Sequence, residues 1–257
     1  MDIAEVLDEI TTGIEFDLGR APDHPVDKIG EICDSASSGY RTLAGCGLIV
    51  DADTDAYYHF LARSGLVRRY FLDRCRREAP DLQNGYRAAG NSPALFDALA
   101  ARHFGLAREV AALSNTSPWE GEEYAEDFFW AHFFHLTIRE SPDAPAVQQT
   151  VQDLEEALAG DTPARLAVCK SLAARDQEAF DEAFGALLAE RRAVLAEQGE
   201  PFTPYDEAEH RVAASCYIDG LAVLNVADHL GLSTRAEYRY CPRAARVPMR
   251  AAFPQSL

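Results

Sequence analysis

Carboxylate and imidazole side chains gather in residues 119–135, where they could bind a metal ion. They are Glu120, Glu122, Glu123, Glu126, Asp127, His132 and His135. Helical bundles build di-iron sites from such side chains, with Glu-x-x-His placing two ligands on one helix face and a second helix repeating the motif. Here Glu126 precedes His132 by six residues and Asp127 precedes His135 by eight, so neither pair has that spacing. The pattern favours histidines at core or boundary positions on an aromatic face and solvated carboxylates, which suit the positive end of a helix.

Motifs of other catalytic centres are missing from the sequence. No Gly-x-Ser-x-Gly elbow indicates a serine hydrolase, and no Gly-x-x-x-x-Gly-Lys-Ser/Thr or Gly-x-Gly-x-x-Gly loop indicates phosphate binding. The six cysteines form no Cys-x-x-Cys pair, so we expect buried, reduced thiols. Six arginines between positions 63 and 77 are interleaved with Asp73 and Glu78, which is typical of a salt-bridged helix face. We therefore predict no catalytic residue, no metal and no cofactor.

Acidic residues outnumber basic ones by 42 to 24, which gives a formal net charge of −18 over 257 residues. This charge argues against nonspecific binding to nucleic acid or to an anionic membrane, because both require a basic surface. A hydrophobic fraction of 47% predicts a folded core rather than disorder. We predict one helical domain over residues 1–257, with a possible subdivision into 1–115 and 116–257. The start of the chain has acids where a signal peptide needs a basic region, and no apolar run is long enough to span a membrane, so we expect a cytoplasmic protein.

Apolar residues recur at helical spacing through nearly the whole chain, which predicts an all-α fold with about nine antiparallel helices. The first expected helix covers residues 6–14, and the second follows the helix-breaking residues 21–25 and ends at about residue 50. The other expected helices cover residues 53–77, 95–110, 119–138, 144–158, 162–174, 180–195 and 204–230. Residues 166–195 are typical of a tetratricopeptide-like hairpin that turns at 174–176. Residues 233–257 contain three prolines and five arginines, and we expect an irregular basic tail that folds back on the acidic body.

Caps and prolines predict where several of these helices begin and end. Asp53 or Thr54 can cap the helix that follows, and the pairs Ser92-Pro93, Ser117-Pro118 and Thr162-Pro163 each place a capping side chain before a proline at the first helical position. Gly231 is expected to end the last helix in a left-handed conformation.

Three stretches resemble a known family. They are EYAEDFFWAHF at 123–133, LAARDQEAFDEAF at 172–184, and YIDGLAVLNVADHLG at 217–231 continued by EYRYCPRAAR at 237–246. Together these stretches are similar to immunity protein 49, a family of antidotes in bacterial polymorphic-toxin systems. The resemblance covers residues 115 to 246, and no catalytic motif can be carried over from the family.

The resemblance implies a cytoplasmic, non-enzymatic protein that binds one cognate secreted toxin and neutralises it. Many toxins that attack nucleic acid have basic clefts, so an acidic partner would associate rapidly with them. We therefore predict that the toxin is bound through Glu120, Glu122, Glu123, Glu126 and Asp127, although these acids could equally be a solubilising face. We interpret Asp219-Gly220-Leu221 as helix packing, with Gly220 permitting a close approach.

Two alternatives stay open at this point. One is a helical-bundle metal-dependent oxidase or oxygenase, in which the acids and histidines of residues 126–135 gain further ligands from other helices. The other is a helical adaptor that binds a protein partner in the hairpin at 162–196.

Overall fold

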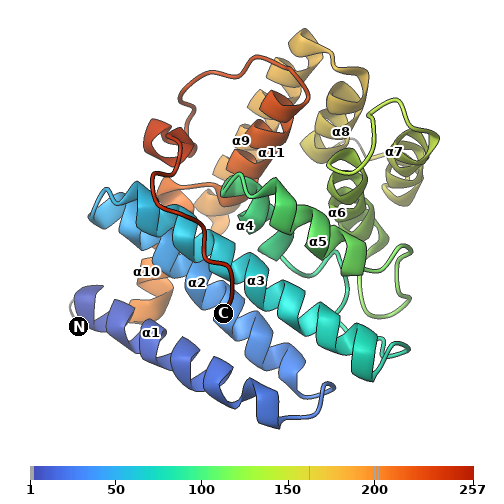
Figure 1. Ribbon diagram of the computed structural model, residues 1–257. Helices are drawn as coiled ribbons and strands as arrows, with labels where there is room; N and C mark the ends of the chain where they lie inside the picture. The colour runs from blue at the N-terminus through green and yellow to red at the C-terminus, as the bar shows by residue number, and fades with distance from the viewer. Residues whose placement is uncertain (1–2, 162, 200, 202) are drawn as a thin grey trace.

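The apolar periodicity of the sequence folds into helices along almost the whole chain (Figure 1). The structure, a computed structural model, describes residues 3–161, 163–199, 201 and 203–257. The α-helices are α1 Ile3–Arg20, α2 Ile29–Val50, α3 Thr54–Glu78, α4 Ala94–Ala100, α5 Phe104–Leu113, α6 Ala125–Thr137, α7 Pro145–Ala157, α8 Ala164–Ala174, α9 Gln177–Glu197, α10 Pro204–Ser215 and α11 Ile218–His229. Two 3-10 helices, η1 Ala21–Asp23 and η2 Arg243–Arg246, complete the described elements, which include no β-strand. The all-α prediction is confirmed.

The described residues form eleven α-helices rather than about nine, because two predicted helices are broken. The expected helix at 95–110 is interrupted at Arg102, whose φ of 59° is left-handed, and His103 then caps α5 by accepting a hydrogen bond from the Leu106 amide at 3.2 Å. The expected helix at 204–230 is interrupted by extended backbone at Cys216, and the next amide, Tyr217 N–H, bonds to the Tyr240 carbonyl at 2.6 Å. Apolar spacing continues across both breaks and therefore does not reveal them.

Several predicted helix ends agree with the structure and others do not. Asp53 caps α3 by accepting from the Ala56 amide at 2.9 Å, and Gly231 has the expected left-handed φ of 88°. The predicted helix start at Trp119 is wrong, because residues 119–124 form turns and α6 begins at Ala125. The predicted cap at Ser92 is shifted by one residue, since Pro93 itself occupies the cap position of α4. Thr162 lies outside the described residues.

Helices α1, α2 and α3 lie beside one another, with α10 against α1 and α2 (Figure 1). Helix α4 packs between α3 and α11, and α5 also covers α3. The remaining helices form a chain of neighbours in which α6 contacts α7, α7 contacts α8 and α8 contacts α9. After α11 the tail crosses back toward α3, so that the C-terminal end lies over the N-terminal helices (Figure 1).

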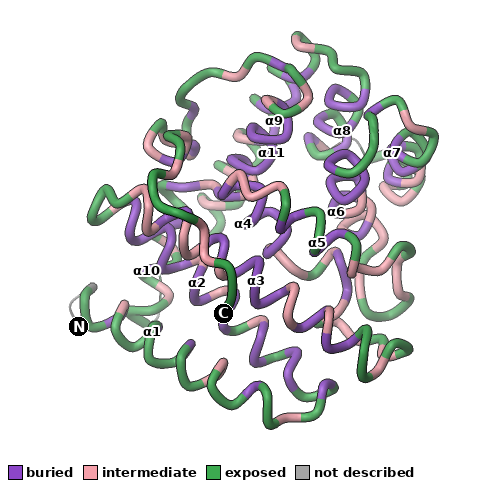
Figure 2. The backbone as a smooth tube through the Cα atoms, in the orientation of Figure 1, coloured by how far each residue is buried: buried purple, intermediate pink, exposed green. Residues whose placement is uncertain are grey.

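One cluster of buried apolar side chains includes residues of every α-helix and of the tail. All seven residues of α4 are buried, and α11 is buried from Ile218 to Ala227 except at Asp219. Figure 2 shows these two central helices largely in the colour of buried residues, whereas the outer side of α1 is exposed. Polar side chains on α4 and α11 must therefore find partners inside the protein.

The six cysteines are buried free thiols, as the sequence pattern led us to expect. Burial raises the pKa of Cys33 to about 12, which keeps that thiol protonated and unreactive. None of the helices in the described part of the chain is both long and apolar enough to cross a membrane.

Candidate functional site

The five acids predicted to bind a partner lie on the turns before α6 and on its first turn. Glu120 and Glu122 are exposed, and Glu126 is half-buried. Between them, the aromatic side chain of Tyr124 is 73% exposed at the N-cap of α6. This stretch therefore presents negative charge and one large amphipathic side chain to solvent.

Two of the predicted acids are engaged within the protein. Glu123 accepts hydrogen bonds from the Gly90 amide at 2.8 Å and from the Asn115 side-chain amide at 2.6 Å, and from the Trp119 amide at 3.2 Å. Asp127 forms an ion pair with Arg165 of α8 at 2.7 Å. These contacts hold the acidic turns against neighbouring segments. The side chains of Glu120, Glu122 and Glu126 form no hydrogen bond or ion pair with any described residue, although the Glu122 carbonyl accepts from the Asn91 side-chain amide at 2.8 Å.

Of the two histidines of α6, His135 is buried and His132 is half-buried. His135 is 3% exposed, and burial, supported by the nearby charges of His132, Arg68 and Arg139, lowers its pKa to about 3. His132 stacks on Phe128 with ring centroids 5.0 Å apart, and its pKa is also lowered by burial. Among the described residues no group of three or more His, Cys, Asp or Glu side chains could hold a metal ion. The prediction of core or boundary positions agrees with the structure, in which His135 is a core residue and His132 a boundary residue stacked on an aromatic ring.

Five of the six arginines at positions 63–77 have hydrogen-bond or ion-pair partners, whereas exposed Arg76 has none among the described residues. Two of the five do more than form surface ion pairs. Arg68 is buried and its guanidinium donates to the carbonyls of Tyr86, Arg87 and Ala88, which anchors the loop after α3. Arg74 donates to the carbonyls of Ala21 and His24 and pairs with Glu78. The guanidinium groups of Arg68 and Arg74 therefore point into the protein rather than toward solvent.

A buried charge cluster joins α2, α3, α4 and α11 and was not predicted from the sequence. Arg41 donates to Asp97 at 2.5 Å and also pairs with Asp219. Asp97 is fully buried and accepts a second hydrogen bond from Ser64 at 2.6 Å. Burial raises the pKa of Asp97 to about 6, against the opposing effect of Arg41. The partners of Arg41 are 56 and 178 residues away in sequence, so no local spacing could reveal the cluster. The only signal was an aspartate inside an otherwise apolar seven-residue helix.

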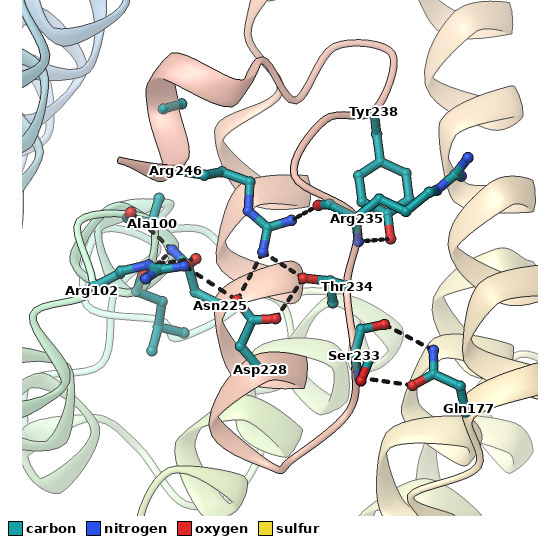
Figure 3. Close-up of polar contacts among 12 residues, drawn as sticks. Ala100, Arg102, Gln177, Asn225, Asp228, Ser233, Thr234, Arg235, Tyr238 and Arg246 are labelled. Carbon is teal, nitrogen blue, oxygen red and sulfur yellow. Dashed lines mark hydrogen bonds and ion pairs between the residues drawn. The ribbon is translucent and has the colours of Figure 1, made fainter. Parts of the chain in front are cut away.

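A second polar network ties the tail to α11 (Figure 3). Asp228 accepts from Arg102 at 3.2 Å and from Arg246 at 2.8 Å, and from Thr234 at 2.5 Å. The Arg246 side chain is only 7% exposed and also donates to the Arg235 carbonyl at 2.7 Å. The expectation that the basic tail folds back on the acidic body is met at this position.

In the motif Asp219-Gly220-Leu221, the glycine and the leucine act in packing, whereas Asp219 pairs with Arg41. Gly220 faces the ring of Tyr217, and a Cβ atom there would lie 2.5 Å from that ring and 3.2 Å from the Cys241 sulfur. Leu221 is fully buried. The close approach predicted for Gly220 is present in the structure.

Comparison with known proteins identifies a family. The family model described as immunity protein 49 matches residues 51–245. The match begins well before the stretch at 115 at which the resemblance was expected to start, and it spans α3 to η2. No curated protein and no solved structure matches the chain significantly. The chain belongs to the immunity protein 49 family.

Proposed function

We propose that this protein is a non-enzymatic immunity protein that binds one cognate secreted bacterial toxin in the cytoplasm and neutralises it. Membership of the immunity protein 49 family is the observation that carries the proposal. The interior agrees with a binding role, because His135 of α6 is packed in the core rather than at an open site. The net charge of −18 favours a partner with a basic surface, for which complementary potentials accelerate association.

We assign first contact with the toxin to the turns before α6, with Glu120, Glu122 and Glu126 as the acids that face it. Tyr124 supplies an apolar anchor in the middle of these acids, since tyrosine is enriched among the residues that dominate binding energy. Glu123 and Asp127 support this surface through their internal contacts rather than by facing the partner.

Coexpression tests the function directly. The gene for this chain would be expressed together with the C-terminal toxin domain of the large secreted protein encoded next to it, and growth would be scored. Rescue of growth and a stable complex of the two purified proteins are expected. Continued toxicity with a well-expressed, folded chain would contradict the proposed function.

Charge reversal tests the surface. The double variant Glu120→Lys/Glu122→Lys should slow association with an inactivated toxin domain by about tenfold at low salt and by less at physiological salt, because screening weakens the lost attraction. Asp8→Lys/Glu9→Lys on α1 is the matched control, since it changes the net charge by the same amount at exposed positions. Equal association rates for the two double variants would place the contact elsewhere on the protein.

A further inference from the structure

A small cavity opens at the break between α10 and α11. Arg41 and Asp219 of the buried charge cluster form part of its lining. Its walls come from α2, α9, α10 and the start of α11, and its volume is about 190 Å³. That volume corresponds to roughly six water molecules at ~30 Å³ each. It is below the range of about 300–1,000 Å³ that is usual for small-molecule sites. The cavity therefore fits one amino-acid side chain better than a free metabolite.

Charged side chains line this cavity and determine what it can accept. Arg41 and Arg191 contribute positive charge, and Asp219 and Glu209 contribute negative charge. Asp97 lies directly behind Arg41, so the ionised cluster carries three carboxylates against two guanidinium groups, an excess of one negative charge. A single cationic guest would neutralise the cluster, whereas an anionic guest would double the excess.

The two arginines have partners in the walls, although the buried Nε–H of Arg191 has none among the described residues. Arg41 is shared by Asp97 and Asp219. Arg191 donates to the Ala213 carbonyl at 3.0 Å, and its guanidinium lies over the ring of Tyr217, 5.2 Å from the centroid. By contrast, Asp219 uses one of its two oxygens for Arg41 and remains 34% exposed. Glu209 is exposed on α10 and accepts from the Thr42 hydroxyl at 3.4 Å and from the Tyr205 hydroxyl, which leaves part of its acceptor capacity unused. Carboxylate oxygens of Asp219 and Glu209 can therefore accept hydrogen bonds from a ligand that enters the cavity.

We propose that this cavity receives an arginine side chain of the toxin, with the guanidinium held between Asp219 and Glu209. The inference rests on the proposed function and specifies its anchor point. Arginine fits because its planar fork of N–H donors matches carboxylate geometry and because its stem can pack against apolar walls such as Val212. Arginine is also enriched among interface residues that dominate affinity.

The substitution Glu209→Gln tests the proposal without disturbing the Arg41 cluster. Isothermal titration calorimetry with an inactivated toxin domain should show a Kd at least about tenfold weaker than that of the wild-type chain. Glu207→Gln is the matched control, because Glu207 is exposed on the same helix and pairs with Arg211. Two residues correspond to about 200° of rotation around a helix, so Glu207 lies on the opposite face. This control should bind within twofold of wild type.

Substitution of toxin arginines by alanine completes the experiment. One such variant should lose the same factor in affinity, and combining it with Glu209→Gln should add little further loss, because both changes remove the same pair. Wild-type affinity for Glu209→Gln, measured with a folded protein, overturns the cavity proposal while the proposed function stands. Failure of the wild-type chain to bind or neutralise the toxin overturns both.

Discussion

Replacing His135 by glutamine should make the protein less sensitive to mild acid. In the folded protein this imidazole is 3% exposed and its pKa is lowered to about 3, chiefly by burial. In the unfolded chain a histidine has a pKa of about 6.5. Because the folded-state pKa is the lower one, the unfolded state takes up the proton first, and stability is lost as pH falls below about 6.5.

The size of the effect follows from this difference in proton binding. Between pH 7 and pH 5 the unfolded histidine becomes almost fully protonated while folded His135 stays neutral, so the wild-type protein should lose about 2 kcal/mol from this group. Glutamine does not titrate in this range. The free energy of unfolding of His135→Gln should therefore fall by about 2 kcal/mol less than that of the wild-type protein over the same interval.

Urea unfolding followed by circular dichroism at pH 7, 6 and 5 measures this difference. His132→Gln is a useful control, because His132 is only half-buried and should contribute a smaller pH-dependent loss. Parallel pH profiles for the wild-type protein and His135→Gln would refute the reasoning that burial holds His135 neutral. So would a ring-proton resonance of His135 that titrates near pH 6.5 in the folded protein.

Two further substitutions test the polar networks of the interior. Asp97→Ala should lower the free energy of unfolding by about 2–3 kcal/mol, because Arg41 and Ser64 would lose their fully buried partner while Arg41 keeps its contact with Asp219. Urea titration measures this change, and a loss below about 1 kcal/mol would show that the pair is dispensable. Arg246→Met keeps much of the apolar stem but removes the contacts to Asp228 and the tail, so it should cost about 2–3 kcal/mol and increase hydrogen exchange mainly in residues 233–246. Unchanged exchange in that segment would show that other contacts hold the tail.

The sequence predicts the helical class and many helix ends because those depend on neighbouring residues. The cap at Asp53 and the C-cap at Gly231 each involve contacts or conformations within a few positions, and both are present. The break at His103 could not be predicted in the same way, since it depends on an imidazole acting as a cap within an apolar repeat. The start of α6 was misplaced because Ser117-Pro118 resembles a helix start while Glu123 folds the following residues into turns.

The candidate sites show the same difference between local features, which the sequence predicts, and long-range contacts, which it does not. Residues 120–127 could be recognised from composition alone, whereas the internal roles of Glu123 and Asp127 depend on partners in distant loops and helices. The cavity at the start of α11 combines residues from four helices. Its residues on α9 and α11 belong to stretches that the sequence had distinguished, but those on α2 and α10 do not. Long-range pairing of this kind requires the three-dimensional fold.

The structure also changes the meaning of the net charge. Arg68, Arg74 and Arg246 direct their guanidinium groups at carbonyls and carboxylates of the interior, with little exposure to solvent. Asp97 is the only acid among the described residues that is buried to the same degree. More positive than negative charge is therefore withdrawn from the surface, and the solvent-facing charge is more negative than the sequence total of −18. Long-range steering still follows the net charge of −18, because buried charges contribute to the distant field. The unequal burial acts at short range instead, since a basic partner in contact with the surface meets exposed acids more often than the composition alone predicts.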